Sequence, residues 1–243
     1  VVEHNYVQNT NLETYDTGGI EVTQQDRELR SGSIIRSNIV ADTIGYSTAG
    51  PDRPVFLSWG IYLDSFAGGY TVTGNLVLRN NNGGIMLQGG KGNTVVNNIF
   101  VDGRAFQGYL ANFRGNFADE VLERNIFVWS NPKAAVFAHG SISPKVITID
   151  HNLYWPGRAA PLGFGYGGRE TWAAWRKLGF DEHSFIANPR FRDPSHGDYS
   201  LLPDSLALKL GFKPLDLGPA LRARARCHCK IVPAARVFFA EKP

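Results

Sequence analysis

The chain has 243 residues, of which 43% are hydrophobic and 19% are charged. This is enough apolar material for a packed core and too little net charge for a disordered chain. The formal charge of +3 is concentrated in a basic stretch near the C-terminus, "LRARARCHCK", so we expect no nucleic-acid partner. No run approaches the roughly 18 to 20 apolar residues that span a membrane, so we expect no membrane association either.

The main pattern along the chain is an internal repeat. A turn-and-strand signature, as in "EHNYV", "RSNIV" and "TGNLV", recurs at six asparagines: Asn5, Asn38, Asn75, Asn98, Asn125 and Asn152. A second strand lies between successive asparagines: "GGIEVT", "WGIYLD", "GGIMLQ", "YLANFR" and "AAVFAH". These strands are short, rich in β-branched and aromatic residues, and show no helical periodicity. The pattern predicts that residues 1–160 form the coils of a parallel β-helix, stacked about 4.8 Å apart.

The repeated asparagines have a structural explanation. Asparagine tolerates the left-handed conformation of tight turns, and its amide can bond the backbone or the matching amide one coil away. We therefore predict an asparagine ladder rather than catalytic asparagines. His4 precedes the ladder residue Asn5, at the repeat position that Arg124 and His151 hold in later coils, and we expect His4 to be a solvated turn residue. The first two intervals, 33 and 37 residues, predict loops on the early coils, including "STAGPDRPVF".

The repeat ends near residue 160. The segment "GRETWAAWRKLGFDEHSF" places Trp172, Trp175 and Leu178 at helical spacing, which predicts a short helix covering the open end of the stack. We assign residues 161–216 to a C-terminal cap and extended segment of the same domain.

Residues 217–243 form a basic tail without strand alternation. We expect it to be disordered or not to be the natural end of the domain. Its "CHC" motif is too tight for an ordinary disulfide between Cys227 and Cys229, and it offers too few ligands for a zinc site. The sequence thus predicts no metal site.

These features resemble the pectin-lyase-like, right-handed parallel β-helix superfamily of carbohydrate-active proteins. The segments "GIYLD…GGYTVTGN…GGIMLQGGKGNTVVNNIFVD" and "DEHSFIANPRF" are similar to β-helix glycoside hydrolases that act on xylosidic or fucosidic linkages. The resemblance covers most of residues 1–216. It implies a secreted or periplasmic, monomeric protein that acts on polysaccharide or oligosaccharide without a cofactor. The superfamily also contains lyases, epimerases and non-enzymatic adhesins. The abrupt start at Val1 suggests a processed product or a fragment.

Candidate site residues follow from strand alternation. Inward Ile61 and Leu63 turn Tyr62 and Asp64 outward. Carrying this alignment from coil to coil predicts two outward rows: Thr23, Asp64, Gln88, Arg114 and His139, and Glu21, Tyr62, Met86, Asn112 and Phe137. A one-residue slip in "GYLANFRG" is the alternative, but it would bury Arg114 unpaired, which is costly.

Glycoside hydrolysis usually takes two carboxyl groups, roughly 5 to 5.5 Å apart for retention and 6.5 to 9.5 Å for inversion. Asp64 is the first candidate. In related β-helix hydrolases the second acid can stand one coil further along the row, where this chain has the amide Gln88. Glu21, expected about 8 Å from Asp64, is the preferred partner. Asp16 competes, although an Asp before a Gly pair is often a turn residue.

We expect six residues to bind substrate: Tyr62, Gln88, Asn112, Arg114, Phe137 and His139. The leading hypothesis is an extracytoplasmic glycoside hydrolase with Asp64 and either Glu21 or Asp16 as acid and base. One alternative is a polysaccharide lyase, in which Arg114 neutralises a uronate, His139 moves its proton and Ca²⁺ assists. The other is a non-catalytic glycan-binding solenoid.

Overall fold

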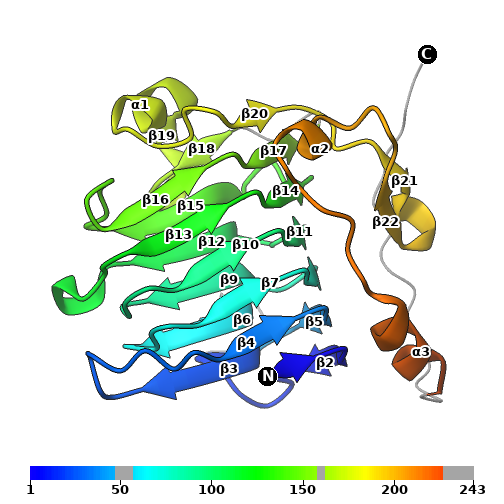
Figure 1. The fold of residues 1–243 in the computed structure, drawn as a ribbon, viewed down its shortest axis with the longest axis horizontal. Coiled ribbons are helices and arrows are strands. Elements are labelled where there is room, and N and C mark those ends of the chain that lie inside the picture. Colours follow the sequence, from blue (N-terminus) through cyan, green and yellow to red (C-terminus); the bar gives the residue numbers. More distant parts are fainter. Residues whose placement is uncertain (47–56, 158–161, 227–243) are drawn as a thin grey trace.

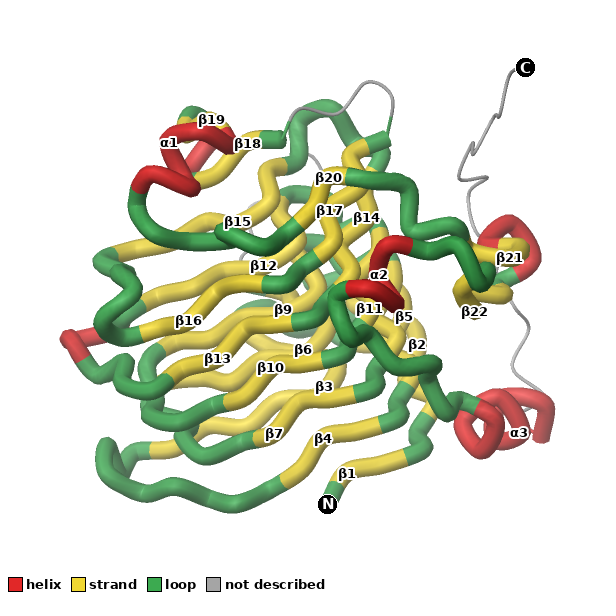
Figure 2. Tube along the Cα trace, turned by 45° about the horizontal axis from the view of Figure 1, so that its top comes forward, coloured by secondary structure: helices red, strands yellow, loops and turns green. Residues whose placement is uncertain are grey.

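The computed structural model describes residues 1–46, 57–157 and 162–226. The chain winds into a parallel β-helix of three sheets, as Figures 1 and 2 show from two directions. Successive coils add neighbouring strands to the same sheet, and every pairing within the three sheets is parallel. The predicted all-β solenoid is therefore confirmed.

We call the three sheets A, B and C. Sheet A contains β1 (Val2–Glu3), β4 (Ile34–Arg36), β7 (Thr71–Thr73), β10 (Thr94–Val96), β13 (Glu120–Glu123) and β16 (Ile147–Asp150). Sheet B contains β2 (Tyr6–Thr10), β5 (Ile39–Thr43), β8 (Leu76–Leu78), β11 (Ile99–Val101), β14 (Ile126–Trp129), β17 (Leu153–Pro156) and β20 (Phe185–Ile186). Sheet C contains β3 (Thr17–Gln24), β6 (Ser58–Ser65), β9 (Gly83–Gln88), β12 (Phe106–Ala111) and β15 (Ala135–Gly140).

The interior of the helix is a continuous stack of apolar side chains, one layer per coil. Sheet B supplies aromatic rings at the same inward position in three coils. Phe100 lies 5.0 Å from Phe127, and Phe127 lies 5.4 Å from Tyr154, with the rings stacked. Because no coil can bury its inner face alone, these contacts between coils hold the solenoid together.

The predicted asparagine ladder is present at the turn between sheets A and B. In each step the backbone N–H and the side-chain amide of one asparagine donate to the Oδ1 of the asparagine one coil later, as in the 3.0 and 2.9 Å bonds from Asn75 to Asn98. The ladder runs from Asn5 to Asn152 and ends on the cap, where Asn152 donates to Ser184 and Asp181. It pairs polar groups that the stacked turns would otherwise bury unsatisfied.

The residue before each ladder asparagine has a positive φ in every coil, between 51° and 67°: His4, Ser37, Gly74, Asn97, Arg124 and His151. Glycine adopts this conformation most readily, and asparagine, aspartate and histidine are enriched there among the other residues. The turn geometry thus accounts for the histidines at the first and last of these positions.

The predicted cap covers the open end of the stack. It consists of β18 (Gly163–Phe164), the 3₁₀ turn η2 (Tyr166–Gly168), β19 (Glu170–Thr171) and α1 (Trp172–Lys177). The hydroxyl of Thr171 accepts from the Ala174 N–H and starts the helix. Trp175 is fully buried and stacks 4.4 Å from Phe164. Leu178, by contrast, is 51% exposed and contributes little to this packing.

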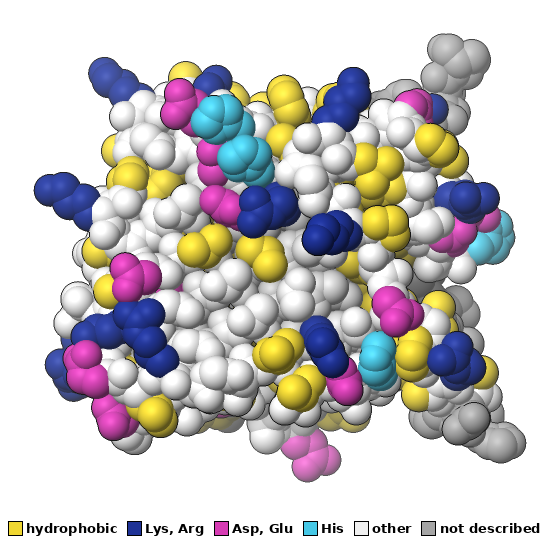
Figure 3. All heavy atoms as spheres, viewed as in Figure 1, with side chains coloured by type: hydrophobic (Ala, Val, Ile, Leu, Met, Phe, Trp, Pro, Cys, Tyr) yellow, Lys and Arg dark blue, Asp and Glu magenta, His cyan; other side chains and the backbone are white. Residues whose placement is uncertain are grey.

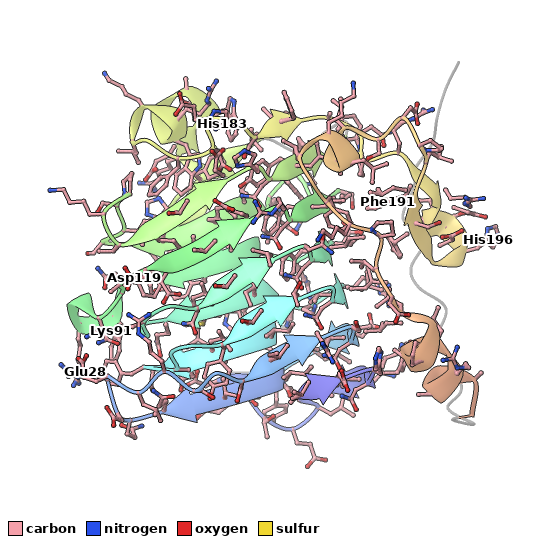
Figure 4. All side chains as sticks on the ribbon, in the orientation of Figure 1. Glu28, Lys91, Asp119, His183, Phe191 and His196 are labelled. Atoms are coloured by element: carbon pink, nitrogen blue, oxygen red, sulfur yellow. The ribbon has the colours of Figure 1, made fainter. Side chains whose placement is uncertain are left out.

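The remaining C-terminal chain lies along the outer face of sheet B (Figure 1). It contains β21 (Phe191–Asp193), η3 (Pro194–His196), β22 (Asp198–Leu201), α2 (Leu206–Lys209) and α3 (Gly218–Arg226). Figure 4 shows Phe191 on the side of this segment that faces sheet B, where it joins an apolar cluster with Phe212 and outward residues of that sheet.

The first part of the predicted tail is thus helical rather than disordered, because Ala220 of α3 is buried in that cluster. Residues 227–243, with Cys227 and Cys229, lie outside the described residues. Among the described helices, none is long and apolar enough to cross a membrane.

Candidate functional site

A group of acidic side chains lies on the outer face of sheet C, where the first two strands of the sheet pair. Register places Glu21 opposite Tyr62 and Thr23 opposite Asp64. Asp16 lies just before β3 in a left-handed turn with φ 54°. Its Oδ1 accepts a 3.2 Å hydrogen bond from the Tyr62 hydroxyl. The structure therefore brings together the three acids that the sequence singled out.

Thr23 links two of these acids. Its hydroxyl oxygen lies 3.3 Å from Asp64 Oδ2 and 3.5 Å from Glu21 Oε1. Those two carboxylate oxygens are therefore separated by at most the sum of the distances, about 6.8 Å. This is shorter than the expected 8 Å, because both side chains lean toward Thr23. This upper limit on the separation of the two carboxylates allows the spacing of a retaining pair as well as the shortest spacings of an inverting pair.

Each carboxylate is held by nearby donors. Asp64 accepts from the Ser65 N–H at 2.6 Å and lies 3.3 Å from the Ser65 hydroxyl. Glu21 accepts from the Thr17 hydroxyl at 2.7 Å and from the Gly18 N–H at 3.0 Å. Both acids are oriented by their own strand or the residues next to it, and Glu21 keeps an exposed side chain.

The electrostatics of the cluster act on the carboxyl group of Asp16. Burial raises the pKa of the Asp16 carboxyl, and the negative charges of Asp64 and Glu21 raise it further, against the lowering effect of the Tyr62 hydrogen bond. Burial also raises the pKa of the Tyr62 phenol, helped by the charges of Asp64 and Asp16. Asp16 is thus suited to carry a proton.

Two further parts of the outer face adjoin the acids. Gln88 follows Leu87, which opposes Leu63, and its Oε1 accepts from the Ser65 N–H at 3.3 Å. The predicted proximity of Gln88 to Asp64 is therefore present. Further along sheet C, Tyr109 opposes Met86 and stacks 6.0 Å from Trp59. Tyr166 of the cap makes an edge contact with Tyr109 and is 59% exposed.

The predicted row does not extend to Asn112 and Arg114. Ala111, not Arg114, opposes Gln88. Leu110 pairs with Leu87 in the inward position, and strand β12 ends at the next residue, before Asn112 and Arg114. Asn112 begins the 3₁₀ turn η1 (Phe113–Gly115) and accepts from the Phe117 N–H. Arg114 is exposed in this turn with φ 52°, and its guanidinium lies over the Phe113 ring.

Phe137 and His139 point inward, opposite to the predicted orientation. Phe137 opposes Gly108 and is fully buried among core rings. His139 opposes Leu110, contacts Trp175 and lies with Nε2 3.2 Å from Glu170 Oε2. The predicted register of β15 was displaced by one residue, which moves every side chain to the other face of a strand. Gly140 is the residue that actually aligns with Gln88 through Ala111.

The structure also assembles a group that the sequence analysis missed. Asp150, His151 and His183 place one ligand atom each within 4.8 Å of one another. Figure 3 shows paired histidines beside acidic side chains near the top of the face that is turned to the viewer, and Figure 4 labels His183 at the same place. The available signal was the similarity of "EHSF" to "DHNL", which continues the repeat by one coil.

A cavity of about 250 Å³ lies elsewhere, between sheet A and the C-terminal chain, and is lined by Thr73, Val96, Asn97, Arg124, Gly211 and Lys213. The acids of sheet C do not line it. The predicted loop "STAGPDRPVF", residues 47–56, falls outside the described residues.

No protein-family model, curated protein or solved structure matches this chain.

Proposed function

We propose that the protein is a glycoside hydrolase of the pectin-lyase-like type, secreted or periplasmic, that cleaves a plant or microbial polysaccharide on the outer face of sheet C. The observation that carries the proposal is the convergence of Asp16, Glu21 and Asp64 around Tyr62 and Thr23. Paired carboxyl groups in different environments are what acid and base catalysis of glycosidic cleavage requires.

The environments suggest a division of roles. Asp16, whose pKa is raised by burial and by its acidic neighbours, is the general acid that protonates the leaving oxygen. Asp64, which accepts hydrogen bonds from Ser65 and Thr23, is the carboxylate that activates water or attacks the sugar. Glu21, also within reach of Thr23, raises the pKa of Asp16 and is the competing partner.

The aromatic side chains further along sheet C support binding of an extended glycan. Tyr109 lies two strands from Tyr62 in the same row, a distance of about 10 Å along the stack. Its phenol ring and that of Tyr166 provide partly exposed faces against which sugar rings can pack. A chain lying along the stack would then contact both the acids and these rings.

The first test measures sugar release from xylan, fucosylated glycans and arabinans. We expect Asp64→Asn and Asp16→Asn each to lower kcat by about 10²- to 10⁴-fold on the substrate that wild type cleaves, because each removes an acid or base. Asp119→Asn is the matched control, since Asp119 is an exposed acid paired with Arg30 away from this cluster. It should keep wild-type activity.

Three results would contradict the proposal. Full activity of Asp64→Asn removes that residue from the mechanism. A rise in ultraviolet absorbance on alginate, pectate or chondroitin identifies an unsaturated product and hence a lyase. Tight glycan binding without turnover identifies a non-catalytic solenoid. The lyase has less structural support, because Arg114 packs on Phe113 while His139 bonds Glu170.

A further inference from the structure

Two histidines occupy the same repeat position in adjacent coils. His151 precedes the ladder residue Asn152, and His183 precedes Ser184, which takes the next place in the ladder by accepting from the Asn152 N–H. Strand pairing follows the same register, with Leu153 opposite Phe185. The two imidazole rings are stacked, with centroids 5.1 Å apart and planes 16° apart.

Asp150 faces both imidazoles and is already oriented. Its Oδ1 accepts from the backbone N–H groups of His151 at 2.8 Å and His183 at 2.7 Å. Its Oδ2 lies 2.7 Å from His183 Nδ1 and 3.5 Å from His151 Nδ1. One carboxylate oxygen is thus held by the backbone while the other points at two ring nitrogens.

His151 Nδ1 is a buried atom that makes no hydrogen bond with any described residue, although Asp150 Oδ2 lies 3.5 Å away. A buried ring nitrogen without a partner is costly, and an ion bound between the rings would satisfy it. The unsatisfied nitrogen adds to the grouping of the side chains as an observation that points to a ligand.

We propose that Asp150, His151 and His183 form a site for Zn²⁺ or a similar divalent first-row transition-metal ion, with water completing the coordination. Imidazole nitrogen and carboxylate oxygen are the donors that such ions accept, whereas Ca²⁺ and Mg²⁺ prefer oxygen donors alone. The backbone hydrogen bonds to Asp150 Oδ1 act as the outer support that such ligands usually have.

The geometry needs only a small adjustment. With metal–ligand distances of 2.0 to 2.2 Å, tetrahedral ligands lie about 3.4 Å apart, close to the 3.5 Å between His151 Nδ1 and Asp150 Oδ2. The 2.7 Å between His183 Nδ1 and Oδ2 must open. The side chain of His183 is 61% exposed, so there is room for its ring to turn when the bond to Asp150 opens.

A bound ion would connect the cap to the last complete coil. His183 follows α1 on the cap side of the chain, whereas Asp150 ends β16, and 33 residues separate them. The site would therefore close a long loop and stabilise the end of the solenoid. It involves the turn beside sheet A and is independent of the proposed glycan site on sheet C.

The test is metal titration of the full chain by calorimetry and, with Co²⁺, by visible absorption. All proteins in this test, which we call the background chain and its variants, carry Cys227→Ser, His228→Ala and Cys229→Ser, because "CHC" could supply metal ligands of its own. After chelator treatment, we expect one Zn²⁺ per chain and a Tm that rises with zinc. His151→Ala and His183→Ala should each weaken binding by at least about tenfold.

His4→Ala is the matched control. His4 holds the same repeat position and lies beside Glu3. Among the described residues its buried Nδ1 also makes no hydrogen bond, but no second imidazole stacks on its ring. It should leave zinc affinity unchanged. The proposal is overturned if the background chain binds neither metal, or if binding survives His183→Ala. Circular dichroism of the metal-free variants checks that they fold, and Asp150→Asn, which keeps an oxygen for the backbone donors, must also weaken binding.

Discussion

At the scale of single residues, burial decides the chemistry of Glu120, which no sequence pattern distinguishes. This glutamate begins β13 and is fully buried. Its Oε1 accepts from the Asn93 N–H, and its Oε2 has no hydrogen-bond partner in the part of the chain that the structure describes. Burial raises its pKa to about 8. The nearby charge of Arg30 opposes this rise, and the charge of Asp119 adds to it. The glutamate therefore holds a proton in the folded protein where the unfolded chain would have released it.

This proton makes stability depend on pH. Between the ordinary pKa of 4.5 and the folded value of about 8, only the folded state binds the proton, so wild type loses stability as pH rises through this range. Glu120→Gln should remove the loss and be more stable than wild type at pH 8 by on the order of a few kcal/mol. Urea unfolding at pH 5, 6.5 and 8 measures it. Glu13→Gln, at an exposed position, should show the same pH dependence of the free energy of unfolding as wild type. If Glu120→Gln also lost stability with rising pH as wild type does, this account would be wrong.

At the scale of the element, the repeating unit is a coil closed by the asparagine turn. Asn98 is fully buried, and its side chain bonds the coils on both sides: its amide donates to Val72 and Asn125, and its Oδ1 accepts from Asn75. The periodic asparagines predicted this ladder because its geometry repeats with every coil. The strands of sheet C vary more between coils, and there the predicted register failed.

Asn98→Ala should destabilise the protein by about 2 to 4 kcal/mol, because it leaves several buried backbone and amide groups without partners. Asn5→Ala is the control at the exposed end of the same ladder, where water replaces the lost bonds. Its cost should be under about 1 kcal/mol. Equal losses for the two variants, measured by urea unfolding followed through tryptophan fluorescence, would show that burial does not set the ladder's contribution.

At the scale of the whole molecule, the C-terminal chain completes the solenoid by covering sheet B. The strands of this sheet are apolar on both faces, as in "IFV" and "IFVW". One face fills the interior, and the other packs against Phe191, Phe212 and Ala220. Without this segment, a continuous apolar surface would be exposed.

Phe212→Ala should therefore cost about 3 to 5 kcal/mol, since Phe212 is 4% exposed and packs on sheet B. Leu178→Ala, at a residue that is 51% exposed on the cap, should cost under about 1 kcal/mol. Differential scanning calorimetry of both variants compares the losses. If Phe212→Ala unfolds like wild type, the segment does not contribute to the stability of the solenoid.

The candidate site was partly predictable. Asp64, Tyr62 and Glu21 lie in neighbouring strands whose register follows from a clear apolar alternation, so their outward position could be inferred. Phe137 could not be placed, because "AAVFAH" contains apolar residues at consecutive positions and its alternation permits either face.

The sequence by itself determined the coil, because a ladder amide and inward apolar residues must recur wherever turns stack. It also identified the three acids at the start of sheet C. Only the tertiary structure decided which residues meet across long intervals, such as Asp150 with His183 and α3 with β2. These contacts depend on how the cap and the C-terminal chain fold back, and no local period encodes that path.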